Sequence, residues 1–309
     1  MAQLPSTMVV EPFGEVNVFQ EADGSIRVRT TILMKPSIEG AQTGLAIDGS
    51  QSMQKMFGAS GVVSALFAST MPNVIEPVAR TLASYLANFD TDGETTVIYW
   101  ACGIGGGEIE EQGDLSATNA STHSFIAPKK FGTGTKLLPA IKYFTETRFS
   151  QAQWSIFVFI TDGEIEDLDD VESYSIELAK QIAAQKRNFV KLVLIGIGDA
   201  VNEGQMEELD DLDYGGLKTQ DGDDIDLWDH KLASEMQKLE EIFAEVVSAN
   251  MILSPSAQIN DDAGNPVIPL DRSSYSDGLP ALLNFKMPAG AKAFSLTLPG
   301  GPTITQPLQ

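Results

Sequence analysis

Four short, almost uninterrupted apolar runs constrain the fold of this chain most. They cover residues 45–47, 96–99, 156–160 and 192–197. Parallel strands are covered by helices on both faces, so their sequences read as continuous apolar runs rather than as alternating patterns. Between the runs, apolar residues recur at helical spacing over 73–88 and 171–187, with Asp169 or Asp170 as the expected cap of the second helix. This alternation predicts an α/β fold with a doubly wound, mostly parallel sheet.

The two ends of the chain follow a different pattern. Over 15–36, apolar and polar residues alternate on both sides of a turn at 22–25, which predicts a hairpin of half-buried antiparallel strands. After residue 250, short apolar segments are separated by turn residues and show no helical period. They cover residues 257–259, 266–270, 279–285 and 293–298. Together the two ends approach the size of a small β-sandwich, typically about 100 residues.

These patterns divide the chain into three ranges. We predict an α/β domain over 38–250. Residues 1–37 and 251–309 are expected to co-fold into one small all-β domain, into which the α/β domain is inserted.

Charge and cysteine content exclude several classes of function. The formal net charge of −23 opposes nucleic-acid binding, because phosphate neutralisation needs clustered Lys and Arg. The same charge disfavours binding to an anionic membrane surface. Cys102 is the only cysteine, so neither an intrachain disulfide nor a thiolate metal cluster can form. We expect Cys102 to be a small buried side chain near the end of a strand. No stretch approaches the length of a membrane span, and residues 1–12 lack the pattern of a signal peptide. These features predict a cytoplasmic protein.

Side chains that carry oxygen follow the first apolar run. Asp48, Ser50 and Ser52 alternate with other residues, so their oxygens can converge on one side of an extended backbone. Mg²⁺ prefers oxygen ligands at about 2.1 Å and usually keeps several waters, so such a cluster suits it better than zinc. Asp, Gly and Ser are also favoured in ordinary turns after strands. This motif alone therefore leaves both interpretations open.

The expected topology predicts which other residues lie at the same edge of the sheet as Asp48. In doubly wound folds, ligands bind beyond the carboxyl ends of the strands. Asp48 follows the first apolar run and Asp162 follows the run at 156–160, so both carboxylates should lie at the same edge of the sheet. Thr135 precedes a helical stripe and should reach the same edge from a loop.

Three separated motifs resemble, in the same order, the metal-ion-dependent adhesion site of von Willebrand factor type A (vWA) domains. Residues 48–52 resemble its first motif, residues 130–137 the segment that supplies a threonine ligand, and residues 159–164 its third motif. The resemblance covers roughly residues 38–250 and implies a Rossmann-like fold. It also implies a Mg²⁺ site, with Mn²⁺ or Ca²⁺ as alternative ions. The implied ligands are Asp48, Ser50, Ser52, Thr135 and Asp162.

The acidic loops at 87–94 and 160–167 resemble those of intracellular vWA domains of the copine and tellurium-resistance types. This association implies a role in stress response or complex assembly, with an AAA+ ATPase or another stress-system component as a candidate partner. Copines carry two lipid-binding domains before the vWA domain, for which 309 residues leave no room, and this argues against a calcium-driven membrane role. We expect a protein-interaction module in which an exposed Asp or Glu of the partner completes the shell of the ion.

Two other classes of function compete with this one. A metal-independent scaffold or adaptor would keep the fold without using the ion. An Mg²⁺-dependent phosphotransferase of the haloacid-dehalogenase type would need an Asp where Ser50 stands, and Ser-His-Asp hydrolysis would need His123 or His230, which read as surface or loop residues. Ser50 also lacks the Gly-x-Ser-x-Gly setting, and the glycines at 103–107 and 132–136 lack nucleotide-loop spacing. We therefore expect no enzymatic activity.

The acidic segment at 207–229 fails the spacing of an EF-hand and predicts a solvated loop, with the last strand of the sheet at 225–228. An apolar stripe then predicts a final helix over 231–249, with Asp229 near its start. In vWA domains with an adhesion site this last helix shifts with the ligand state, so the resemblance implies a switching role.

Overall fold

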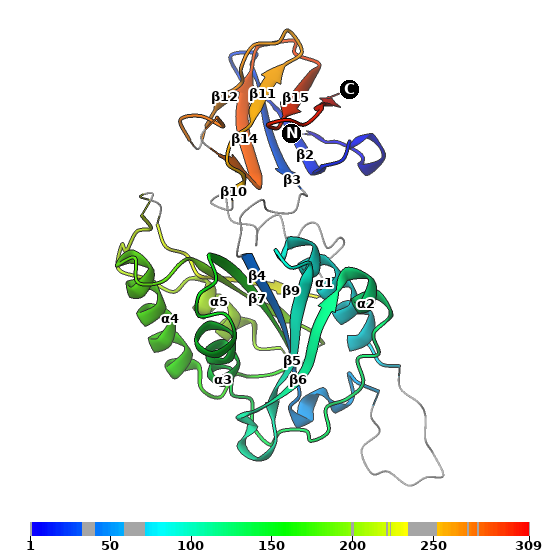
Figure 1. The fold of residues 1–309 in the computed structure, drawn as a ribbon, viewed down its shortest axis with the longest axis vertical. Helices are drawn as coiled ribbons and strands as arrows, with labels where there is room; N and C mark the ends of the chain where they lie inside the picture. The colour runs from blue at the N-terminus through cyan, green and yellow to red at the C-terminus, as the bar shows by residue number, and fades with distance from the viewer. Residues whose placement is uncertain are drawn as a thin grey trace. The chain divides into compact units, whose positions relative to one another are not determined.

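A computed structural model describes residues 2–32, 41–58, 72–198, 201–220, 222, 224–233, 252–270, 272–276 and 278–308. The chain divides into two compact units (Figure 1). One consists of Glu39–Gln237, and the other of Met1–Ile38 together with Lys238–Gln309. Each unit is described by itself.

The larger unit is built on a six-stranded sheet. From edge to edge its order is β6 (Glu108–Ser116), β5 (Glu94–Cys102), β4 (Ala41–Asp48), β7 (Trp154–Thr161), β8 (Val190–Gly196) and β9 (Trp228–Leu232). All neighbouring strands are parallel except β5 and β6. The predicted fold class is confirmed, and the four apolar runs lie in β4, β5, β7 and β8. Every residue of β7 and β8 is buried, as expected for strands covered on both faces.

Helices cover both faces of this sheet. They are α1 (Ile75–Phe89), α2 (Ala117–Thr122), α3 (Leu138–Lys142), α4 (Leu168–Ala183) and α5 (Glu203–Asp210). Figure 1 shows α1 and α2 on one side of the sheet and the other three on the opposite side. A π-helical turn, Tyr143–Arg148, continues α3 and places Phe144 against Phe157 of β7, with ring centroids 4.6 Å apart.

The helix-cap prediction is wrong for α4. The helix begins at Leu168, so Asp169 and Asp170 lie in its first turn rather than at its cap. Asp167 occupies the cap position, but its carboxylate accepts hydrogen bonds from the backbone N–H groups of Leu137 and Leu138, at 2.8 and 3.1 Å. Asp167 therefore satisfies the start of α3, because a helix start leaves N–H groups without partners inside the helix.

The last strand lies later than predicted, at Trp228–Leu232 instead of 225–228. Lys231, predicted to begin the final helix, therefore belongs to β9, and most of that predicted helix falls on 234–251, outside the described residues. The acidic segment is not entirely a solvated loop either. It begins in α5, and Ile225, Leu227 and Trp228 are buried.

The smaller unit is all-β and draws strands from both chain ends. One sheet has the order β1 (Ala2–Gln3), β2 (Phe13–Gln20), β3 (Ile26–Ile32), β14 (Leu282–Met287) and β12 (Ile268–Pro269). A second has β11 (Gln258–Asp261), β15 (Ala293–Thr297) and β16 (Thr303–Pro307), and β10 (Ile252–Ser254) pairs with β13 (Leu279–Pro280). β2 and β3 form the predicted hairpin, and β3 pairs antiparallel with β14 from the other end.

Two features hold these ends together. Phe294 of β15 makes edge-to-face contacts with Phe13 of β2 and Phe285 of β14, with centroids 5.0 and 5.2 Å apart, so the two sheets share a core. The buried Gln306 accepts a hydrogen bond from Val10 N–H at 2.7 Å and donates one to the Met8 carbonyl at 3.1 Å. The prediction that both ends form one small all-β domain is confirmed.

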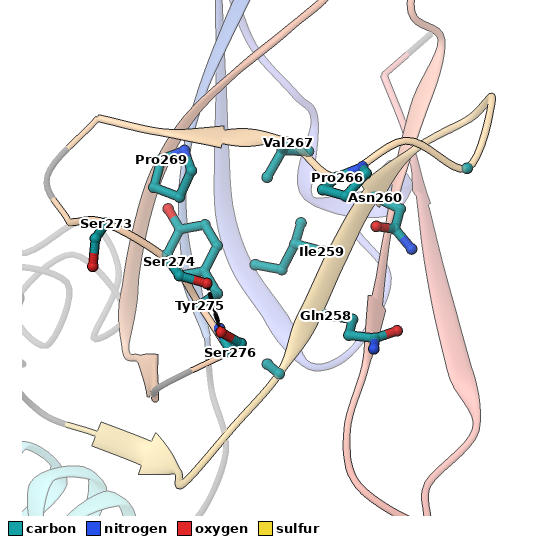
Figure 2. A pocket seen from close by; sticks show the side chains of 12 residues that line it. Gln258, Ile259, Asn260, Pro266, Val267, Pro269, Ser273, Ser274, Tyr275 and Ser276 are labelled. Carbon is teal, nitrogen blue, oxygen red and sulfur yellow. Dashed lines mark hydrogen bonds between the residues drawn. The ribbon is translucent and has the colours of Figure 1, made fainter.

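A pocket of about 550 Å³ lies in this β unit (Figure 2). It is bordered by β11, by the segment that leads into β12, and by residues 273–276. Its lining carries no charged side chain and mixes apolar residues with Gln258, Asn260 and three serines. None of the predicted metal ligands belongs to this unit.

Asp90 predicts a pH dependence of stability. It lies buried after α1 and accepts a hydrogen bond from Thr43 N–H at 2.7 Å, yet burial raises its pKa to about 6. The folded state therefore keeps a proton that the unfolded state releases above about pH 4, so this contribution to stability falls as pH rises towards 6 and is constant above it. Between pH 4.5 and pH 7, the free energy of unfolding of wild type should fall by about 1 to 2 kcal/mol more than that of Asp90→Asn. Urea unfolding of both proteins at the two pH values measures this difference. An equal pH dependence of the two chains would contradict this.

Candidate metal site

The predicted site lies where the winding direction of the sheet reverses. The chain passes from β4 to β5 on one side and from β7 to β8 on the other, so the switch point lies between the carboxyl ends of β4 and β7. Asp48 is the last residue of β4, Thr161 is the last residue of β7, and Asp162 follows it. Both carboxylates are buried.

Hydrogen bonds connect four of the five predicted ligands, namely Asp48, Ser50, Ser52 and Asp162, into one network. Ser52 Oγ donates to Asp162 Oδ1 at 2.7 Å and lies 2.9 Å from Ser50 Oγ, so Ser50 is the donor between the two serines. Asp48 Oδ1 accepts from Ser50 N–H, and its Oδ2 accepts from Thr161 Oγ1, both at 2.7 Å. The ends of β4 and β7 are therefore connected through side chains of the candidate site.

Thr135 is held nearby by backbone contacts. Its loop pairs with the segment that carries Ser50: Gln51 N–H donates to the Gly132 carbonyl at 2.9 Å, and Gly132 N–H donates to the Gly49 carbonyl at 2.8 Å. Thr135 is buried and precedes the first residue of α3 by three positions. Among the described hydrogen bonds, none joins its hydroxyl to the other four side chains, so only its position places Thr135 with them.

Glycines allow the close approach of these loops. A Cβ atom at Gly132 would lie 1.7 Å from the Ala101 carbonyl oxygen, and one at Gly49 would lie 2.7 Å from Cys102 Sγ. Cys102, at the end of β5, is buried, and burial raises the pKa of its thiol to about 12. It therefore acts here as a small packing residue.

Gly132 yields a matched pair of substitutions. Gly132→Ala should destabilise the larger unit by about 1 to 3 kcal/mol, because the added methyl collides with rigid backbone. Gly107→Ala is the control, since a Cβ atom at Gly107 would have nothing within 4 Å of it and the φ of this residue is −107°. Denaturant unfolding of both variants measures the difference. Equal stabilities would show that the loop pairing tolerates the methyl.

Electrostatics make the pair of carboxylates costly without a cation. The pKa of Asp48 is raised to about 6, chiefly by burial and in smaller part by the nearby charge of Asp162, while hydrogen bonds from Ser50 and Thr161 act in the opposite direction. Burial also raises the pKa of Asp162. A doubly charged ion between them would balance both negative charges.

The donor set fits a hard cation. Two carboxylates and up to three hydroxyls provide only oxygen ligands, as Mg²⁺ prefers. Within the described part of the chain there is no group of three or more His, Cys, Asp or Glu residues that could hold a metal. The candidate is therefore a mixed carboxylate–hydroxyl site rather than a carboxylate or histidine cluster.

Two residues in the neighbourhood were not predicted. Thr161 orients the Asp48 carboxylate, and Asp167 fixes the helix start that follows Thr135. Thr161 stands next to Asp162 inside a motif that the sequence already marks, so its position was a usable signal. The acidic run at 164–170 contains Asp167, but no local pattern indicates which of its carboxylates turns inward.

Comparisons with known proteins do not identify the residues of a functional site in this chain. No family model matches the chain, and no curated protein matches it. Among solved structures, it is similar to the crystal structure of the ArnB paralog VWA2 from Sulfolobus acidocaldarius. That likeness covers 98% of this chain and 72% of the other at 17% identity and a TM-score of 0.42, which is too low to support a family or a function. No described helix is long and apolar enough to cross a membrane.

Proposed function

We propose that this chain is a vWA-type protein-interaction module that works through a divalent cation, with Mg²⁺ as the first candidate. Its ligands would be Asp48, Ser50, Ser52, Thr135 and Asp162. One observation carries the proposal: two buried carboxylates lie at the ends of neighbouring strands at the switch point, and hydrogen bonds of 2.7 to 2.9 Å through Ser50, Ser52 and Thr161 connect them.

The mechanism follows from the charges. Asp48 and Asp162 would neutralise the ion, while the hydroxyl ligands add no charge, so the cation retains affinity for a further anion. Mg²⁺ usually keeps several waters. An Asp or Glu of a partner protein would displace one of these waters and complete the shell.

Net charge shapes the choice of partner. The charge of −23 repels an acidic partner at long range, but with a Debye length of about 8 Å at physiological salt this repulsion is confined near the surface. The loops beside the site expose both signs, Lys130 and Lys136 as well as Glu164 and Glu166. We therefore expect a partner whose acidic ligand is flanked by basic residues, since complementary charges speed association. The narrower proposal, from the sequence resemblance, is a stress-response or assembly complex with an AAA+ ATPase or a related component.

A peptide selection tests this function. The full chain is used to select from a random peptide library in Mg²⁺, and selected peptides are measured again in EDTA. Peptides should share an Asp or Glu, and exchanging it for Asn or Gln should abolish binding, as should EDTA or Asp48→Ala. Binding that survives all three changes would overturn the proposal.

A further inference from the structure

Ile104 is the most exposed large apolar side chain among the described residues, at 93%. It lies in a glycine-rich turn at 103–107, directly after β5. Full exposure of an isoleucine forgoes the burial that would normally stabilise it. Single exposed apolar residues are common, so the meaning of Ile104 depends on what holds it outward and on what lies beside it.

The turn is built to hold this side chain in place. Gly103, Gly105 and Gly106 have φ values of 72°, 78° and 66°, which L-residues with side chains rarely adopt. Gly105 N–H donates to Thr133 Oγ1 at 2.8 Å, and Thr133 N–H donates to the Gly103 carbonyl at 3.1 Å. Ile104 therefore sits between two points attached to the loop that carries Thr135.

The turn also touches the candidate metal site through backbone. A Cβ atom at Gly106 would lie 1.9 Å from the carbonyl oxygen of Gly134, the residue before Thr135. With 3.8 Å between successive Cα atoms, Ile104 and Thr135 are at most about 15 Å apart. This distance corresponds to about five residues of an extended peptide.

We propose that Ile104 is an apolar contact for the partner segment that supplies the acidic ligand. This inference rests on the proposed function. The partner would carry an aliphatic or aromatic side chain within about five residues of its Asp or Glu. A second copy of this chain, or an anionic lipid surface, fits less well, because a net charge of −23 repels both. A partner segment whose acidic ligand is flanked by basic residues fits better, because Glu164 and Glu166 are exposed beside the site together with Lys130 and Lys136.

The test uses the tightest selected peptide and its variant with Ala at the apolar position. Their Kd values are measured in Mg²⁺ against wild type, Ile104→Ser and Ile268→Ser. Ile268 is the matched control, because it is 65% exposed and lies on β12 in the other unit. Ile104→Ser should raise the Kd of the peptide with the apolar residue about tenfold or more, the effect expected for an isoleucine that is buried on binding. It should leave the Kd of the peptide with Ala at that position unchanged. Both variants should keep the wild-type thermal shift with Mg²⁺.

The outcomes separate the two proposals. Acidic peptides without an enriched apolar neighbour, or equal effects of the two serine variants, would overturn the role of Ile104 and leave the metal-dependent function standing. Absence of any Mg²⁺-dependent acidic peptide would overturn the proposed function and the role of Ile104 together.

Discussion

Asp48→Asn should stabilise the metal-free chain and, at the same time, remove its stabilisation by Mg²⁺. Asp48 is fully buried, and its pKa of about 6 means that ionisation at pH 7 opposes folding. Replacing the carboxylate by a neutral amide of the same shape should therefore raise the free energy of unfolding in EDTA by about 2 kcal/mol. The amide can still accept a hydrogen bond from Ser50 N–H.

Mg²⁺ should reverse this order of stability. A ligand that binds only the folded state stabilises it by about 2.7 kcal/mol at one hundred times its Kd. Wild type should gain this amount, whereas Asp48→Asn should gain little, because one of the two charges that balance the ion is missing. Denaturant unfolding in EDTA and in Mg²⁺ measures both values. The exposed Asp211→Asn is the control and should respond to Mg²⁺ like wild type. An equal Mg²⁺ response of Asp48→Asn would contradict the ligand role.

Lys191→Ala should destabilise the larger unit by about 3 to 5 kcal/mol. Lys191 lies on β8 with 2% exposure, and its Nζ contacts Asp226 Oδ2 at 3.1 Å and Asp229 Oδ2 at 3.0 Å. Burial raises the pKa of Asp229 to about 6 despite this cation. Removing the lysine leaves a largely buried carboxylate without its partner, the costly way to break a buried ion pair.

Lys218→Ala is the matched control for this substitution. Lys218 pairs with Asp224 at 2.8 Å, but both side chains are more than half exposed, so its loss should cost at most about 1 kcal/mol. Unfolding in denaturant compares the two variants, followed by tryptophan fluorescence, because all three tryptophans of the chain lie in the larger unit. Equal costs would show that the Lys191 pair contributes no more than a surface pair.

The same lysine explains one limit of prediction from sequence. The sequence predicts the last strand at 225–228, inside the acidic segment. The strand begins instead at Trp228. Its second residue, Asp229, pairs with Lys191, which lies 38 positions earlier in the chain. A contact over this separation leaves no local pattern. The β6 edge was missed for a different reason: an exposed antiparallel strand rich in Glu108, Glu110 and Glu111 lacks the apolar run that identified its buried neighbours.

The candidate site was predictable to the extent that strand ends determine it. Asp48 and Asp162 follow buried runs, and the carboxyl ends of parallel strands share one edge, so their meeting follows from topology. The parts that orient them did not follow. The Thr161 hydroxyl and the contact of Gly132 with Ala101 depend on how two loops approach each other in three dimensions.

Calorimetric titration of the EDTA-treated, dialysed full chain with Mg²⁺ tests the central claim most directly. We predict one bound ion per chain, lost in both Asp48→Ala and Asp162→Ala and retained in Asp211→Asn. Binding of the same strength in all four proteins, or no binding to wild type at millimolar Mg²⁺, would contradict a metal site at the ends of β4 and β7.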